Sequence, residues 1–421
     1  LVANTTGAYN VAVGYQSLYA NTIGSSNVAL GYRALTANTT GTYNIAIGTN
    51  ALDSNTIGDR IVAIGTDALQ SNTTGYHNQA IGFQCMYSNT TGLFNNAFGY
   101  QALFYNTTGS SNSAFGYSAL LNNTASNNSA FGHGALQLNT SGTPNDAFGF
   151  QALYSNTTGY SNVAVGYQAL TANTTGYENT AFGRSTLPLN TTGAANTALG
   201  RNALGANVTG SNNTAVGSAS LQSNTANNNT AVGYQSLVNN TTGTPNDAFG
   251  YQALYLNTTG VQNVGVGFQT LNNNAIGISN TAVGYKALTS VGIGSTASNY
   301  NVGVGAQAGQ EVTTGISNTL IGAGAGYSVT ALTTGSNNVV IGTSAHTSTV
   351  GATNQIVIGK DGVGQGDNYV SIGIGGTSYI YNQFNTNATW TKASDERIKQ
   401  NIEDLDIGLD FISELKVKQY N

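Results

Sequence analysis

The chain has 421 residues, of which only 6% are charged, 40% are hydrophobic and 55 are glycine, and its formal net charge is −5. Soluble globular proteins have about 25% charged residues, and disordered chains combine low hydrophobicity with high charge, so this composition is typical of neither class. The absence of a basic excess argues against a nucleic-acid partner, and no apolar stretch of about 18 residues predicts a membrane span.

A repeat with a 17-residue period runs along the chain from its first residues. Two repeats are one position shorter, and each has lost part of its Asn-Thr-Thr-Gly segment, so we expect the deletion to lie in a turn. The glycine that closes an Ala-x-Gly step marks the period, with the two shorter steps ending at Gly132 and Gly233: Gly14, Gly31, Gly48, Gly65, Gly82, Gly99, Gly116, Gly132, Gly149, Gly166, Gly183, Gly200, Gly217, Gly233, Gly250, Gly267 and Gly284.

Each unit predicts a turn, a strand, a second turn and a second short strand. Residues 4–7, Asn-Thr-Thr-Gly, have turn chemistry because asparagine and glycine tolerate positive φ. Residues 10–13, Asn-Val-Ala-Val, predict a strand that places its two valines on one face and its alanine on the other. Residues 15–18, Tyr-Gln-Ser-Leu, carry the second apolar group and are expected to form the second strand.

Glycine, asparagine and β-branched residues are poor helix formers, and a unit this short cannot contain a helical pair. We therefore expect an all-β, parallel β-solenoid with one 17-residue unit per coil and coils stacked about 4.8 Å apart. Equivalent asparagines would form side-chain ladders, and equivalent apolar residues would form continuous stripes. Because alanine recurs opposite the Val/Ile/Phe positions, we expect both faces of the strand to be packed. One face would lie inside the coil, and the alanine face would be covered by identical chains around a threefold axis, giving a homotrimeric fibre.

The motif Asn-x-Ala-Val/Ile/Phe-Gly, as in residues 10–14, 44–48 and 95–99, resembles the head repeat of YadA-like trimeric adhesins. This resemblance covers roughly residues 1–375 and implies a left-handed parallel β-roll that is trimeric along its length. Adhesin heads usually have shorter units than this chain. The sequence divides into a regular solenoid at residues 1–289, an irregular solenoid with longer and shorter coils at 290–390, and a charged segment at 391–421.

The last segment predicts a short helix, because Ile398, Ile402, Leu405 and Leu409 follow helical spacing and Ser394 is a suitable N-cap. Residues 394–402, Ser-Asp-Glu-Arg-Ile-Lys-Gln-Asn-Ile, resemble the start of the intramolecular chaperone domain of endosialidases and phage tailspikes. The resemblance implies a truncated copy of a domain that trimerises a β-fibre and then cuts itself off.

By this resemblance, the cut lies between Ala393 and Ser394, with Ser394 as nucleophile and Lys399 as its base. A lysine can act as a base where burial lowers its pKa. The alternative interpretation of the segment is an ordinary capped helix with solvated charges.

Few other residues indicate a metal-binding or catalytic role. His77, His133 and His346 are isolated, so we expect no metal and no other cofactor. Asp146 and Asp247, in two matching Thr-Pro-Asn-Asp segments, are expected to be turn residues.

Two recurring features each have two interpretations, and the single cysteine has one. The recurring Asn-Thr-Thr fits either N-glycosylation or turn chemistry. The tyrosines after the closing glycine, such as Tyr15 and Tyr32, form either a glycan-binding row or a packed stripe. The single cysteine, Cys85, allows no intrachain disulfide and is expected to be a small buried hydrophobe.

Together these patterns favour a structural and adhesive fibre, specifically the shaft of a phage or virus tail fibre on the virion surface. Its expected partners are two identical chains and a host-surface glycan or protein receptor, with no nucleic acid and no membrane insertion. No activity on an external substrate is expected. The alternatives are an extracellular adhesin or filament of a bacterium or archaeon, and an ice-binding solenoid that uses its threonine rows.

Overall fold

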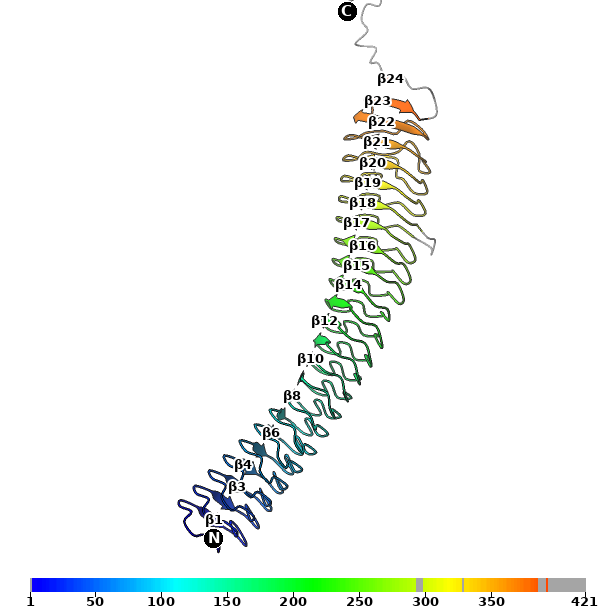
Figure 1. Cartoon of the computed structure of the whole chain (residues 1–421). Helices are drawn as coiled ribbons and strands as arrows, with labels where there is room; N and C mark the ends of the chain where they lie inside the picture. The colour runs from blue at the N-terminus through cyan, green and yellow to red at the C-terminus, as the bar shows by residue number, and fades with distance from the viewer. Residues whose placement is uncertain (1, 293–297, 328, 385–390, 393–421) are drawn as a thin grey trace, which may run out of the picture.

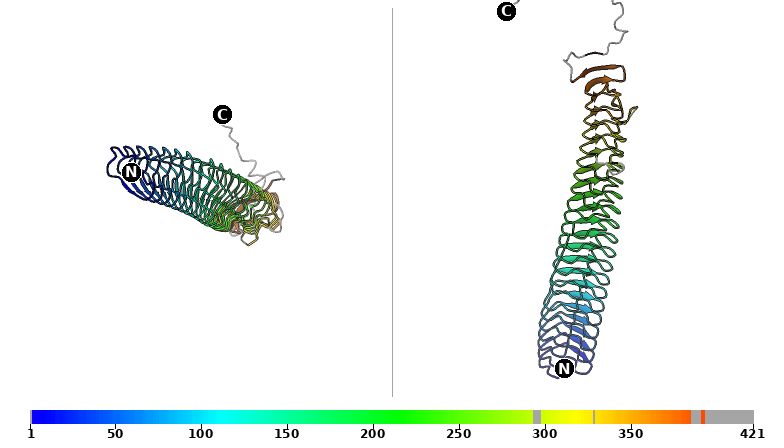
Figure 2. Two further views of the ribbon diagram at one scale, coloured as in Figure 1. Left: turned by 90° about the horizontal axis from the view of Figure 1, so that it is seen from below. Right: turned by 90° about the vertical axis from the view of Figure 1, so that its right-hand side faces the viewer.

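The computed structural model describes residues 2–292, 298–327, 329–384 and 391–392, which form a long, curved rod (Figure 1 and Figure 2). The described residues contain β-strands and turns and no helix, and hence no apolar helix of membrane-spanning length. The helix expected at residues 394–409 lies outside the described residues.

The strands are β1 (Val11–Val13), β2 (Val28–Leu30), β3 (Ile45–Ile47), β4 (Val62–Ile64), β5 (Gln79–Ile81), β6 (Asn96–Phe98), β7 (Ser113–Phe115), β8 (Asn128–Phe131), β9 (Asn145–Phe148), β10 (Asn162–Val165), β11 (Thr180–Phe182), β12 (Thr197–Leu199), β13 (Thr214–Val216), β14 (Asn229–Val232), β15 (Asn246–Phe249), β16 (Asn263–Val266), β17 (Thr281–Val283), β18 (Val302–Val304), β19 (Thr319–Ile321), β20 (Val339–Ile341), β21 (Ile356–Ile358), β22 (Tyr369–Ile374), β23 (Ser378–Gln383) and β24 (Thr391–Lys392).

Each strand from β1 to β21 pairs in parallel with the next strand in the chain, so the protein is a parallel β-solenoid, as predicted. Equivalent residues are stacked directly, for example Ala12 on Ala29. The 17-residue coil is the commonest, whereas the pairs Ser113–Ser129 and Thr214–Thr230 mark the two 16-residue coils. The deletions leave the strands in register, which confirms that they lie in turns.

Coil length varies toward the C-terminal end. Between the pairs β17–β18, β19–β20 and β21–β22, equivalent residues are 21, 20 and 14 positions apart. The direction of pairing then changes, because β22 and β23 form an antiparallel hairpin and β24 pairs antiparallel with β23. The hairpin covers the strand edge of the last coil, an edge that would otherwise be free to pair with other chains.

The expected second strand at residues 15–18 is wrong. This segment is a turn in which Gln16 and Leu18 both have positive φ, 55° and 48°. Such angles are unusual for leucine, but the Leu18 amide donates to the Ala34 carbonyl oxygen of the next coil at 3.0 Å. Alternating left-handed residues let the chain reverse in a few positions while both residue 17 and residue 18 point inward.

The expected orientation of the main strand is also wrong. The alanine row lies inside the coil and is fully buried, as at Ala29 and Ala46, while the Val/Ile/Phe side points outward. The reason is volume: Leu35 and Leu52, from the turn segment, are fully buried in the same narrow interior. Beside a leucine, a 17-residue coil has room for only a methyl group on the strand.

The asparagine ladders are confirmed, and they form two buried rows. In the first row Asn38 Nδ2 donates to Asn21 Oδ1 at 2.9 Å and to the Gly41 carbonyl at 3.1 Å. In the second row the backbone N–H of Asn44 donates to the side-chain oxygen Oδ1 of Asn27 at 3.0 Å. Buried amides need such partners, because an unpaired buried polar group costs about 1–3 kcal/mol. We call the first row, which runs from Asn4 to Asn274, the asparagine spine.

The 16-residue coils interrupt this spine. Asn106 Oδ1 and Asn207 Oδ1, immediately before the two short coils, have no hydrogen-bond partner. At the first break Asn123 Nδ2 donates to the Ala125 carbonyl instead, at 2.8 Å. Removing one turn residue therefore keeps the strand register at the cost of one spine hydrogen bond in each short coil.

Candidate functional site

The residues predicted for self-cleavage, Ser394 and Lys399, and the bond between Ala393 and Ser394 lie outside the described residues. Their roles stay predictions. The candidate site that the described residues offer is the outward face of the strands, which runs the length of the rod.

The last outward position of each strand, before the closing glycine, is apolar in every coil from β1 to β22. Sequence alternation identified this row but placed it inside the coil. We call it the apolar row, and it consists of Val13, Leu30, Ile47, Ile64, Ile81, Phe98, Phe115, Phe131, Phe148, Val165, Phe182, Leu199, Val216, Val232, Phe249, Val266, Val283, Val304, Ile321, Ile341, Ile358 and Ile372.

The apolar row is substantially exposed on a single chain. Phe182 is 54% exposed and Phe148 38%, although their neighbours above and below cover part of each side chain. Four phenylalanines from Phe98 to Phe148 stack with ring centroids 4.6–4.9 Å apart. A contiguous exposed apolar stripe of this length is typical of an interaction surface.

The other outward position of the strand behaves differently. This mixed row begins with Val11, Val28, Ile45 and Val62 and then becomes polar at Gln79 and Asn96. Since the same strands tolerate glutamine, serine, threonine and aspartate there, the strand conformation does not require an apolar outward side chain. The strand conformation therefore does not account for the constant apolar character of the neighbouring row.

Asp146 and Asp247 belong to the mixed row. They lie within strands β9 and β15, so the expectation that they are turn residues is wrong. Each pairs in register with an outward residue of the next coil, Val163 and Val264 respectively. They are 101 positions apart in the chain and do not form a pair of carboxylates.

Next to the apolar row, beyond the closing glycine, aromatic rings form two long stacks. One runs Phe83, Tyr100, Tyr117, His133, Phe150, Tyr167, and the other runs Tyr234, Tyr251, Phe268, Tyr285, with centroids 4.9–5.5 Å apart. The glycine is required at this corner, because Gly48 has φ 132° and a Cβ there would lie 2.5 Å from the Gly65 carbonyl oxygen.

Each interior ring of a stack has a neighbouring ring on both faces, whereas the first rings, Phe83 and Tyr234, have a stacked ring on one face. Arg184 and Lys286 lie over the last rings, Tyr167 and Tyr285, at 5.6 Å and 5.4 Å from their centroids. The interior rings of each stack therefore form a packed stripe without a free ring face for a sugar.

The threonine rows occupy the turn at the opposite end of the coil. The first threonine of the pair donates its hydroxyl to the next coil, as in Thr39 Oγ1 to the Thr56 carbonyl at 3.0 Å. That hydroxyl proton is therefore not directed to solvent. An ice-binding surface would have to rely on the second threonine of each pair, such as Thr40.

The titratable side chains do not form a catalytic cluster. His133 lies within the aromatic stack, His77 contacts Arg60 at 3.3 Å, and His346 contacts the Thr347 carbonyl at 3.0 Å. No group of three metal-ligating side chains occurs in the described part of the chain. Cys85 replaces an interior alanine, and burial raises the pKa of its thiol to about 12.

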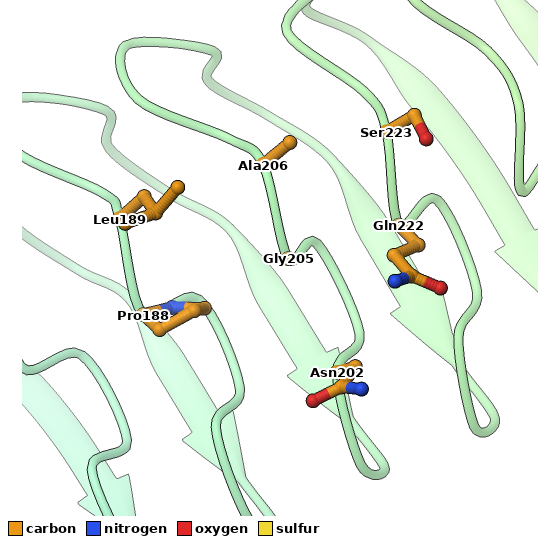
Figure 3. Close-up of a pocket in the computed structure, with 7 residues that line it drawn as sticks. All are labelled: Pro188, Leu189, Asn202, Gly205, Ala206, Gln222 and Ser223. Atoms are coloured by element: carbon orange, nitrogen blue, oxygen red, sulfur yellow. The ribbon is translucent and has the colours of Figure 1, made fainter.

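A shallow hollow of about 350 Å³ lies on another side of the rod (Figure 3). Its lining includes Pro188, Leu189, Asn202 and Gln222 from three successive coils, and it forms where Gly205 supplies no side chain to its row. No charged or nucleophilic group apart from the Ser223 hydroxyl lines it, so it offers no catalytic constellation.

Comparison with known proteins gives one match, at the C-terminus. Residues 394–421 match the family model of the chaperone of endosialidase. No curated protein and no solved structure matches the chain. The chain is thus a β-solenoid repeat protein whose C-terminal segment matches an endosialidase-type chaperone domain, and this matched segment contains both Ser394 and Lys399.

Proposed function

We propose that this chain is the shaft of a trimeric phage or virus tail fibre, which carries the virion's contact with a host-surface glycan or protein and is assembled with a C-terminal intramolecular chaperone. The observation that carries the proposal is the apolar row, which stays apolar and outward along the whole solenoid. The chaperone match at residues 394–421 supports a fibre matured by this route.

Association of copies through the apolar row would remove exposed apolar surface from water. A phenylalanine has about 200 Å² of surface, so the 38% of Phe148 that is exposed is roughly 75 Å². Burying that area contributes about 2 kcal/mol at 25 cal/mol per Å². Repeated over the coils, this gain is large compared with the entropy lost when rigid rods associate.

A parallel ring of identical chains is an arrangement that covers the apolar row of every chain at once. Around a rotation axis along the rod, each copy presents the same coil at the same height, and the rows converge on the axis. The resemblance to endosialidase chaperones favours three copies. YadA-like heads, which the Asn-x-Ala-x-Gly motif resembles, provide the same precedent for a trimeric β-roll.

Equilibrium sedimentation of the chain tests the assembly directly. One copy has a mass of 43.1 kDa, and we expect the measured mass to be three times this value and independent of concentration. A stable monomer would contradict the proposal. Immunogold microscopy with antibodies against the rod distinguishes the two settings, because labelled virion tails support a viral fibre and labelled cell surfaces favour the adhesin alternative.

A further inference from the structure

The outward strand face has two edges, and charges are rare on the first of them. The first edge is the residue three positions before the inward residue of each strand, a row that includes Tyr9, Tyr43 and Tyr300 and adopts positive φ except at Pro144 and Pro245. In this first-edge row only Arg60 and Glu178 are charged among the described residues. The second edge consists of the two residues that follow the closing glycine.

Each of these two charges has an opposite charge on the second edge of its own coil. Glu178, before β11, is followed by Arg184, and Arg60, before β4, is followed by Asp67. Glu178, Arg184 and Arg60 are exposed, and Asp67 is half-buried. The two charge pairs have opposite polarity. The second edge also carries Arg33, Arg201, Lys286, Lys360 and Asp361, which have no charged residue on the first edge of their own coil.

Neither pair forms within a chain. The six residues from Glu178 to Arg184 include strand β11 and span up to about 20 Å at 3.3 Å per residue, which is beyond the reach of the two side chains. Arg184 instead lies over the Tyr167 ring, and no described acidic group lies within 4 Å of it. Arg60 contacts Asp59 at 3.0 Å.

Rotational symmetry brings the two edges together between chains. When strand faces surround a common axis, the first edge of each copy meets the second edge of the next copy at the same height. We propose that Glu178 of one chain pairs with Arg184 of the neighbouring copy, and that Arg60 pairs likewise with Asp67. This inference rests on the proposed parallel assembly and specifies its register.

The apolar row cannot set this register by itself. Sliding one copy by one coil places apolar residues on apolar residues again, so many alignments bury similar areas. After such a slip Glu178 would meet either Tyr167 or Arg201, and Arg60 would meet uncharged edges. Both charge pairs form together only when equivalent coils of the copies lie at the same height. The pairs therefore stabilise this alignment and disfavour alignments shifted by one or more coils.

Cysteine cross-linking tests the register in the full chain carrying Cys85→Ala, since alanine is the usual residue of that row. The test variant combines Glu178→Cys with Arg184→Cys, and a short bismaleimide should convert it to covalent trimers on a denaturing gel. A linker is needed because an ion pair between two long side chains holds their Cβ atoms farther apart than the roughly 3.5–4.5 Å of a direct disulfide. The matched control combines Ser111→Cys, from the same edge four coils away, with Arg184→Cys and should stay uncross-linked.

Sedimentation of the variants before cross-linking separates the two possible failures. A monomer would overturn both the assembly and the register. A trimer that forms no 178–184 cross-link, or that cross-links the control equally well, would overturn the register alone. As a second readout, Glu178→Arg should lower the melting temperature of the trimer. The double change Glu178→Arg with Arg184→Glu should restore that temperature. If the two changes instead lower the melting temperature additively, the pairing is refuted.

Discussion

Replacing Asn156 by alanine tests whether the asparagine spine stabilises the solenoid. Asn156 Nδ2 donates to Asn139 Oδ1 at 2.8 Å and to the Gly159 carbonyl at 2.9 Å, and its Oδ1 accepts from Asn173 Nδ2 at 2.8 Å. At a net value of about 1 kcal/mol each, these three hydrogen bonds contribute roughly 3 kcal/mol. Buried partners left unpaired in the variant add to this loss.

The break in the spine supplies a matched control. Asn106 also donates twice, to Asn89 Oδ1 at 3.1 Å and to the Gly109 carbonyl at 2.9 Å, but its own Oδ1 has no partner. Asn106→Ala therefore removes two hydrogen bonds, worth about 2 kcal/mol. The two variants delete the same atoms from equally buried positions and differ mainly in the accepted bond.

Native-state hydrogen exchange read by mass spectrometry is the appropriate assay, because repeat solenoids open locally and need not unfold in one step. The roughly 3 kcal/mol loss in Asn156→Ala should accelerate exchange in the adjoining coils by about 150-fold, and the roughly 2 kcal/mol loss in Asn106→Ala by about 30-fold. Equal acceleration in both variants, or exchange within twofold of the parent for Asn156→Ala, would refute the reasoning.

Three further outcomes are expected. Phe148→Ser should weaken the proposed trimer by about 2 kcal/mol per chain and lower the sedimenting mass on dilution, whereas Thr158→Ala on the opposite turn should leave the mass unchanged. Because burial raises the pKa of the Cys85 thiol to about 12 from 9.0, the contribution of this thiol to stability should be full below pH 9 and fall as the pH rises toward 12. Chemical denaturation should show a smaller fall in Cys85→Ala, and identical curves would contradict this. In a longer parent containing a complete chaperone domain, Ser394→Ala should abolish release of the C-terminal fragment by intact mass, and continued release would exclude Ser394 as the nucleophile.

Much of the fold could be predicted because the repeat aligns equivalent residues in columns. The 17-residue period, the main strand around Ala46, the turn at the Asn-Thr-Thr-Gly segment and the asparagine ladder through Asn38 all depend on local preferences that recur in every coil. Self-cleavage at Ser394 was inferred from resemblance and remains a prediction.

The tertiary structure decided which side of each strand faces inward. Alternation places Ala46 on one face of the strand and Ile45 and Ile47 on the other. A period of two does not predict which of these two faces is buried. That choice depends on Leu52, which reaches the interior from a left-handed turn that local preferences predict as a strand. Once leucine occupies a coil this small, only a methyl group fits beside it, so the larger side chains of the same strand must point outward. The amino-acid order thus determined the coil and its ladders, and the space enclosed by the coil determined which residues became its surface.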